Sequence, residues 1–548
     1  MKRAFSFLII LFLFYHYAAF AACTKTTDQE SPLPDTWTAA DCSNAEISAC
    51  ISAATSGDTI NVPEGPCTWT DSVTILENKT IKLIGAGSDK TIISRAGLML
   101  YSLSPNSRIS GFRFNLTGSG SSPMISVRNT GWRIDNNYFD NQTGSTKEAI
   151  NPTGVNMTMM PEGVIDHNYL NECRISSDGM GTFDKASAMW AQDHVLGSAN
   201  TVFVEDNTIV RTTATTSMDA NSAGRYVFRY NTVIGVPVMA HSAQGYRATR
   251  AWEVYGNSFT FTNSTFNYIG FMRGGTGTFF YNSTNGPYST GYSINLDEDR
   301  VFRSRGTYGI CDGTAPYGYD GNSINGWPCR DQIGRGKDSS LSSATDMKSQ
   351  ASDPVYFWTN KRSDGTNVLA KIVNGCSDYI QANRDYYDYN TSFNGTSGTG
   401  CGTLAAIPAT CTTGVGYWAT DQSCSDLTGM VGANPGTPIS GTLYKCTATD
   451  TWASSYTPYT YPHPLRTEEG PPDFTITVTN TGTGHSPSHD GARTVQTGGT
   501  LTFTSGVYNG WQIVIGGTCG CATDGCTVTP TENCTITCTS SAIQLMPW

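Results

Sequence analysis

Three residues of types that act in acid–base chemistry recur at similar places along the chain. Asp219, His241 and Arg273 each follow a short apolar run and precede a turn of small residues, and Asp193 and His194 precede a similar turn one repeat earlier. If folding makes these positions neighbours, His241 could act as a base tuned by Asp219, and Arg273 could neutralise a substrate carboxylate. This set suits β-elimination on a uronic acid, which needs a base for the C5 proton and positive charge beside the developing enolate.

Two further residues extend this hypothesis. Arg250 could take the place of Arg273 as the carboxylate partner. Hydrolysis would instead need two carboxyl groups on either side of a glycosidic bond, and Asp219 with Glu253 is the best pair that the sequence offers. The alternative is that these side chains form only a polar column that satisfies turns and solvates the surface.

A second group of acids could bind a cation. Asp135, Asp166 and Glu205 occupy the same position in successive repeats, and Arg229 continues the series. Three carboxylates on adjacent coils could supply the oxygen ligands that Ca²⁺ prefers. The sequence therefore predicts a calcium site as a hypothesis, and no other cofactor.

A repeated segment must position all these side chains. Its form is an apolar residue, two variable residues, Asn, one variable residue and an apolar residue, with Asn137, Asn168, Asn207, Asn231 and Asn257 as the fixed positions. The intervals are 31, 39, 24 and 26 residues, and Asn282 extends the series. A period near 25 residues with short β-rich pieces and Gly-rich turns is typical of a parallel β-helix. Stacked Asn amides would hydrogen-bond from coil to coil along its axis.

Strand alternation then predicts which side chains face the interior of the coils. Pointing inward are Ile134, Ile165, Val204, Phe228 and Val254; pointing outward on the same sheet are Asp135, Asp166, Glu205, Arg229 and Tyr255. The fold class that we predict is all-β, a right-handed parallel β-helix with a disulfide-rich wrap and a small C-terminal β domain.

Two segments carry a resemblance to a known superfamily. Residues 58–65 (DTINVPEG) and 81–87 (IKLIGAG) resemble the first coils of the pectate-lyase-like right-handed β-helix superfamily, over about residues 55–300. Residues 164–167 (VIDH) are similar to a short segment of pectate lyases. The Arg-rich segment of those enzymes and the paired-Asp and Gly-His-Gly segments of polygalacturonases are not found, so no catalytic residue is carried over. The resemblance implies the fold, whereas its motifs specify the activity poorly.

The later part of the chain resembles two other groups. Residues 456–465 (YTPYTYPHPL) resemble the ending of secreted bacterial β-helix proteins. The last segment resembles the small β repeats of bacterial surface proteins related to internalin B. The domain organisation that we predict is residues 1–22 as a signal peptide, 23–57 as an N-terminal cap, 58–300 as the β-helix, 301–466 as last coils and a Cys-rich region, 467–472 as a linker and 473–548 as a β domain.

Composition narrows the compartment and the partners. The chain of 548 residues has 34 Lys and Arg against 45 Asp and Glu, a net charge of −11, which argues against a nucleic-acid binder. Residues 1–22 read as a secretory signal peptide, and no later apolar run is long enough to cross a membrane. Export suits the 17 cysteines, because exported thiols usually pair.

Cys23 has two interpretations. It follows Ala21 and Ala22 directly, which resembles the lipid-attachment signal of bacterial lipoproteins, although Phe20 differs from the usual aliphatic residue. Ordinary cleavage that leaves Cys23 to pair is the alternative. Overall we expect an extracellular or cell-surface carbohydrate-active protein, lyase-like on an acidic polysaccharide; the alternative is a non-catalytic glycan-binding or adhesive surface protein.

Overall fold

The structure is a computed structural model of the chain. It describes residues 23–27, 34–118, 123–143, 147–155, 159–179, 188–190, 192–212, 216–244, 247–288, 291–303, 309–311, 329–338 and 350–466, and, as backbone only, the strands after residue 473. The predicted signal peptide and the predicted linker lie outside the described residues. The chain divides into two compact units, residues 1–459 and 460–548. No helix among the described residues is both long and apolar enough to span a membrane.

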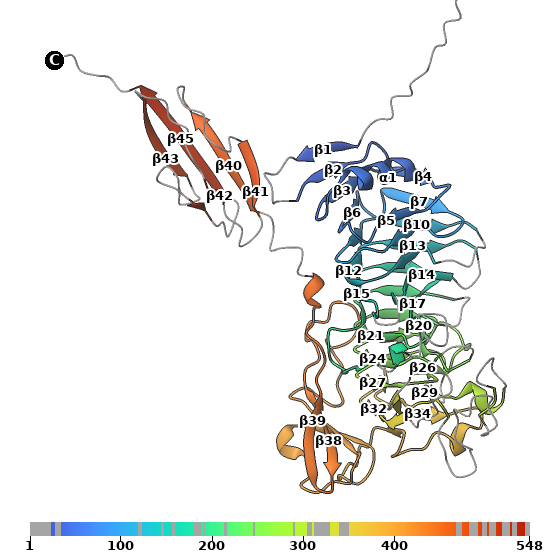
Figure 1. The fold of residues 1–548 in the computed structure, drawn as a ribbon. Coiled ribbons are helices and arrows are strands. Elements are labelled where there is room, and N and C mark those ends of the chain that lie inside the picture. The colour runs from blue at the N-terminus through green and yellow to red at the C-terminus, as the bar shows by residue number, and fades with distance from the viewer. Residues whose placement is uncertain are drawn as a thin grey trace, which may run out of the picture. The chain divides into compact units, whose positions relative to one another are not determined.

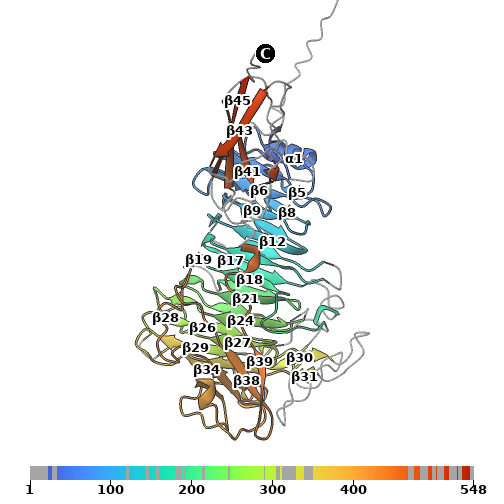
Figure 2. The same cartoon turned by 90° about the vertical axis from the view of Figure 1, so that its left-hand side faces the viewer.

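The first unit is a parallel β-helix whose successive coils each contribute a strand to three sheets (Figure 1). Parallel pairing joins β2 onward in the first sheet, and only β1 pairs antiparallel. In order, the first sheet contains β1 (Thr24–Thr27), β2 (Thr36–Thr38), β3 (Thr59–Val62), β6 (Lys82–Gly85), β9 (Arg108–Ser110), β12 (Thr130–Asp135), β15 (Glu162–Asp166), β18 (Val202–Glu205), β21 (Arg225–Arg229), β24 (Ala251–Tyr255), β27 (Thr276–Phe280), β32 (Val355–Trp358) and β35 (Tyr386–Tyr387). Figure 2 shows β18, β21, β24 and β27 one below another.

The second and third sheets complete each coil. The second sheet contains β4 (Gly65–Thr68), β7 (Thr91–Arg95), β10 (Arg113–Leu116), β13 (Tyr138–Asn141), β16 (Tyr169–Asn171), β19 (Thr208–Val210), β22 (Thr232–Ile234), β25 (Ser258–Thr260), β28 (Ser283–Asn285) and β33 (Lys361–Arg362). The third begins with β5 (Val73–Ile75), β8 (Leu100–Ser102), β11 (Ile125–Val127), β14 (Lys147–Pro152), β17 (Cys173–Asp178) and β20 (Met218–Asn221). After an interruption it continues with β23 (Val238–Ala240), β26 (Tyr268–Met272), β29 (Ser293–Leu296) and β34 (Leu369–Ile372). The parallel β-helix that the sequence predicts is confirmed.

The predicted Asn ladder stands at the turn between the first and second sheets. Asn207 donates its backbone N–H to Asn231 Oδ1 at 3.0 Å and its side-chain amide to the same oxygen at 3.1 Å. The same two bonds link Asn137, Asn168, Asn207, Asn231, Asn257, Asn282 and Asn360 in sequence. The residue before each Asn has a positive φ, including Tyr230 at 55° and Thr359 at 51°. The ladder thus holds a turn that most L-residues avoid.

The interior of the coils is apolar, as the alternation predicts. Ile134, Ile165, Val204, Phe228 and Val254 all belong to one buried core. Their outward neighbours Asp135, Asp166, Glu205, Arg229 and Tyr255 are also buried, at 0% exposure. An outward-pointing side chain at these positions of the first sheet is therefore not exposed to solvent.

A helix and two disulfides cap the first coil. Helix α1 (Asn44–Ala53) begins after Ser43, whose side chain accepts a hydrogen bond from the Glu46 N–H at 3.3 Å. This is the expected N-cap arrangement for Ser followed three residues later by Glu. Disulfides Cys23–Cys50 and Cys42–Cys67 attach the cap. The Cys23 sulfur is bonded to Cys50, and lipid attachment would need the same atom. The structure therefore supports the alternative in which Cys23 forms a disulfide.

At the other end the chain turns back over the coils. A separate sheet contains β36 (Thr399–Gly402), β37 (Gly416–Ala419), β38 (Thr442–Ala448) and β39 (Thr451–Tyr456), stapled by Cys401–Cys424 and Cys411–Cys446. Short elements nearby are β30 (Arg335–Asp338), β31 (Gln350–Ser352) and the 3₁₀ turns η1 (Asp299–Val301), η4 (Cys376–Asp378) and η5 (Leu404–Ala406). The predicted disulfide-rich wrap is present, although Cys173 and Cys376 are free thiols in the described part of the chain.

Residues 432–459, here the return segment, cover the outer face of the first sheet. The Ile439 N–H donates to the Tyr230 hydroxyl at 2.9 Å, and the Tyr459 carbonyl accepts from Arg229 at 2.6 Å. Tyr456 of the return segment contacts Phe280 of β27 edge to face, with ring centroids 6.0 Å apart. The outer face of the first sheet is therefore unavailable to a long ligand in these coils.

The second unit ends in short strands. It contains η6 (Pro464–Arg466), and then β40 (Phe474–Thr481), β41 (Gly491–Val495), β42 (Leu501–Thr502), β43 (Trp511–Gly517), β44 (Thr527–Val528) and β45 (Cys534–Ala542). Four of them form one sheet in the order β41-β40-β45-β43. This agrees with the expectation of a small C-terminal β domain.

Candidate functional site

Asp219, His241 and Arg273 meet on the outer side of the third sheet. Asp219 lies in β20, His241 directly follows β23, and Arg273 directly follows β26. The Arg273 Nη2 donates to His241 Nδ1 at 2.7 Å, and the same His241 nitrogen lies 3.5 Å from Asp219 Oδ2. The structure therefore brings together the three residues that the end-of-strand pattern predicts as neighbours.

The sequence predicts that Asp219, His241 and Arg273 occupy equivalent positions, but Asp219 lies one outward position before the other two. The His241 N–H donates to the Ala220 carbonyl and the Arg273 N–H to the Ala240 carbonyl, both at 3.0 Å, so His241 is level with Asn221 rather than Asp219. The third sheet is interrupted between β20 and β23 at Pro237, which has no N–H to donate. The Pro237 carbonyl still accepts from Ser217 N–H at 2.8 Å, so the two pieces stay adjacent.

His241 is neutral near pH 7. Burial lowers its pKa to about 4, against the opposing charge of Asp219 and with a smaller contribution from Arg273. Because a guanidinium can only donate, Nδ1 of the neutral imidazole accepts from Arg273 and the ring proton is on Nε2. The lone pair that a base would use is therefore already occupied, which weighs against the elimination hypothesis.

A cluster of carboxyl groups lies directly beside these residues. Arg174 in β17 donates to Glu148 Oε1 at 2.7 Å and to Asp219 Oδ2 at 3.3 Å. Asn151 donates to Glu148 Oε2 and to Asp178 Oδ2, each at 3.2 Å. Side chains from three neighbouring strands, β14, β17 and β20, thus hold three carboxyl groups around one guanidinium.

Asp178 differs from the other two acids. Burial, then the negative charges of Glu148 and Asp219, raise its pKa to about 8. Its Oδ1 has no hydrogen-bond partner among the described residues. Asp178 is therefore protonated at neutral pH. A carboxyl group with a raised pKa close to other carboxyl groups is one feature of the acid–base pairs that cleave glycosidic bonds.

Glu253, the predicted hydrolytic partner of Asp219, is elsewhere. It lies in β24 of the first sheet, beneath the return segment, at 1% exposure. It accepts from the Gly197 N–H at 2.8 Å and from the Tyr456 hydroxyl at 2.7 Å. Burial raises the pKa of Glu253. Glu253 thus attaches two loops to the sheet. The prediction that Asp219 and Glu253 form a hydrolytic pair is therefore wrong.

Arg250 and His194 also lie apart from the cluster. Arg250 donates to the Trp190 carbonyl at 3.3 Å and lies 3.8 Å from Asp353 Oδ2. His194 is close enough to Arg225 and Arg250 for their charges, after burial, to lower its pKa well below the usual value. Arg250 is therefore not an alternative to Arg273 as the partner of His241.

The predicted calcium ligands have arginine partners. Arg108 binds Asp135 with two bonds of 2.8 and 2.6 Å, and Arg133 binds Asp166 with two bonds of 2.9 Å. Glu205 lies 2.6 Å from Arg229. No group of three or more His, Cys, Asp or Glu side chains that could hold a metal ion occurs in the described ranges. Each of the three predicted calcium ligands therefore forms an ion pair with an arginine of a neighbouring coil.

These ion pairs lead to a first prediction. Because the guanidinium groups already neutralise Asp135, Asp166 and Glu205, chelation with EDTA should leave the thermal midpoint unchanged within about 1 °C. Calcium at about 5 mM, above the Kd range of extracellular calcium modules, should also leave it unchanged. The measurement is thermal unfolding followed by circular dichroism. A calcium-dependent rise that disappears in Asp135→Asn would contradict the ion-pair account.

Glu148, Arg174 and Asp178 were not found from the sequence. The Asn repeat marks the turn between the first two sheets, so it gives no register for the third. The signal was nevertheless present: Arg174, Ser176 and Asp178 alternate with Cys173, Ile175 and Ser177, which places the polar residues on one face.

The three sheets, the ladder and the outward polar cluster define a parallel β-helix protein. No protein-family model and no curated protein matches the chain. Among solved structures, the catalytic domain of a GH87 alpha-1,3-glucanase in complex with tetrasaccharides is similar at 10% sequence identity and a TM-score of 0.22, over 68% of this chain and 70% of that chain. A similarity at this level carries no inference about the site, which depends on the geometry above.

Proposed function

We propose that this protein is a glycan-cleaving enzyme of the hydrolase type, with Asp178 as general acid and Asp219 as the base or nucleophile. The observation that carries the proposal is that Asp178, Glu148 and Asp219 are joined through Asn151 and Arg174, while burial and the two neighbouring acids raise the pKa of Asp178 to about 8. Asp178 would protonate the leaving-group oxygen, and Asp219 would activate water or attack the anomeric carbon. Arg174 would hold Asp219 and Glu148 in place.

The third sheet suits an extended polysaccharide. Tyr101, Ser126 and Asn151 face outward in register on successive strands, and Ser176 is in register with Asp219 on the next pair. Neighbouring strands are about 4.8 Å apart, which is close to the length of one sugar unit. The return segment covers the first sheet but not these residues, which supports the third sheet as the binding face.

Hydrolysis is favoured over the β-elimination that the sequence suggested, because the His241 nitrogen facing the cluster accepts from Arg273. In this proposal His241 and Arg273 bind substrate oxygens beside the acids. The five disulfides in the described ranges suit the oxidising surroundings of an exported enzyme. We therefore place its action outside the cytoplasm.

The proposal is tested by incubating the protein with a panel of neutral and acidic polysaccharides. We expect new reducing ends from at least one glycan, with kcat/KM falling above about pH 8 as Asp178 loses its proton. Asp364→Asn is a matched control, because this exposed acid lies in a remote turn. Saturable binding without cleavage of any glycan would support the adhesive surface protein instead.

A further inference from the structure

A short segment, residues 329–335, contacts both loops that carry His241 and Arg273. Asp331 in this segment accepts from Arg247 in two bonds of 2.7 Å and from the Ala248 N–H at 3.1 Å. Its own carbonyl accepts from the Gly275 N–H, two residues after Arg273, at 3.1 Å. One buried residue therefore joins the two loops.

The loop that Asp331 binds is also hydrogen-bonded closely to His241. The Thr249 N–H donates to the His241 carbonyl at 3.0 Å, and the His241 N–H lies 2.8 Å from Thr249 Oγ1. On the other loop, a Cβ at Gly274 would lie 2.8 Å from the Asp331 carbonyl and 3.1 Å from the His241 carbonyl. Contacts this close allow little independent movement of the two loops.

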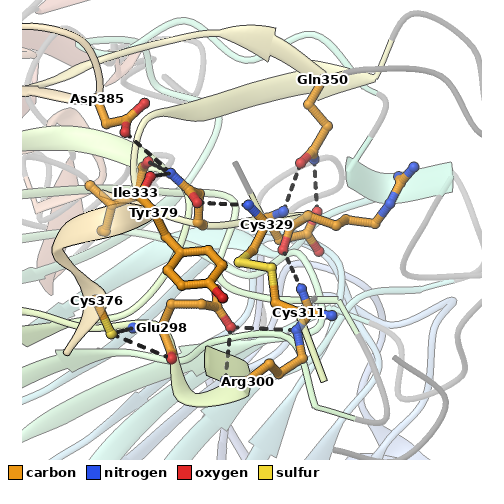
Figure 3. Close-up of a disulfide and its surroundings, with 12 residues drawn as sticks. Glu298, Arg300, Cys311, Cys329, Ile333, Gln350, Cys376, Tyr379 and Asp385 are labelled. Carbon is orange, nitrogen blue, oxygen red and sulfur yellow. Dashed lines mark hydrogen bonds and ion pairs between the residues drawn. A yellow bond between two sulfur atoms is a disulfide. The ribbon is translucent and has the colours of Figure 1, made fainter. Parts of the chain in front are cut away.

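Asp331 follows Cys329 by two residues, and Figure 3 shows the Cys311–Cys329 disulfide with Gln350 and Arg300 nearby. Gln350 forms two bonds with Asp331, one to the carboxylate at 2.7 Å and one from the backbone N–H at 2.6 Å. The Cys311 N–H donates to the Arg300 carbonyl at 2.9 Å, which anchors the other half of the disulfide. Asp331 has a φ of 64°, a conformation that side-chain-bearing residues adopt only when their surroundings impose it.

We propose that Asp331 is a positioning residue of the candidate active site, and that the Cys311–Cys329 disulfide holds it there. Asp331 sets the loop positions from which His241 and Arg273 reach the carboxyl cluster. Both cysteines are buried, at 0% and 1% exposure, so the disulfide acts as a fixed support. The catalytic consequence rests on the proposed function, whereas the effect on His241 does not.

The test measures the titration of His241 directly. The charged groups that act on it are Asp219, Arg273, Arg174 and Asp299. With ¹³C-labelled histidine, NMR resolves the individual imidazoles, and His241→Gln assigns the signal. In the intact protein the pKa of His241 should be about 4. In Cys311→Ala/Cys329→Ala the Arg273 contact loosens, and we expect this pKa to rise by at least one unit.

The control is Cys401→Ala/Cys424→Ala, which removes a disulfide of the wrap instead. Asp331→Asn is the second variant, and the circular dichroism spectrum checks that each variant folds. On a cleaved glycan, kcat should fall about tenfold in the Cys311/Cys329 variant, with KM nearly unchanged, because only orientation is lost. An unchanged His241 titration in both the Cys311/Cys329 and Asp331 variants, or an equal shift in the control, overturns the proposal whether or not a substrate is found.

Discussion

Replacing Asp178 with asparagine should lower kcat/KM on a polysaccharide by about a thousandfold, since a positioned general acid contributes 10²- to 10⁴-fold. The asparagine side chain keeps the shape of Asp178 and its hydrogen bond from Asn151. The fall in kcat/KM therefore reports the loss of the acidic proton alone. The pKa of about 8 also predicts that the alkaline fall in the wild-type pH profile disappears in Asp178→Asn. The measurement is initial rate against pH for both proteins.

Leaving-group dependence separates a lost acid from a damaged fold. An aryl glycoside with an acidic phenol needs little protonation, so Asp178→Asn should retain much more activity on it than on the polysaccharide. Asp219→Asn should be inactive on both, because its role does not depend on the leaving group. Equal losses of Asp178→Asn on the two substrates would count against the assigned roles.

The second large effect concerns the stability of the coils. Asn231 donates to the Val204 and Arg229 carbonyls at 2.9 and 3.0 Å, and its Oδ1 accepts from Asn207. Asn231→Ala leaves these buried groups without partners, at about 1 to 3 kcal/mol each. We expect the stability to fall by at least about 3 kcal/mol, measured as a lower urea midpoint.

Asn263→Ala provides the comparison. This asparagine is exposed and accepts a hydrogen bond from the Thr265 N–H at 2.9 Å. Its replacement should change stability by less than about 0.5 kcal/mol. Similar midpoints for Asn231→Ala and the wild type would show that the ladder does not support the turn.

The coils could be predicted from the sequence because the buried Asn side chain at this turn hydrogen-bonds to the equivalent Asn of the next coil. That rule identified the ladder through Asn282. Asn360 was missed because 78 residues separate it from Asn282, so the period is lost there. The pairing of exported thiols was a compositional rule, and it does not account for the buried free thiols Cys173 and Cys376.

The site was only partly predictable, for a similar reason. Asp219, His241 and Arg273 follow a local pattern of strand and small-residue turn. Glu253 was misplaced because its partner Tyr456 is 203 residues away in the return segment, which no local pattern reveals. The acids Asp135 and Asp166 were recognised, but their arginines come from an outward position on a neighbouring coil, which only the register defines.

The most direct test of the central claim is the mass balance of the cleavage products. If Asp178 and Asp219 act as proposed, mass spectrometry of a digested oligosaccharide will give fragments whose summed mass exceeds the parent by one water, with no absorbance from an unsaturated sugar. Fragments that sum to the mass of the parent, one of them carrying the unsaturated ring, would show elimination and contradict the assignment of the carboxyl cluster as an acid–base pair for hydrolysis.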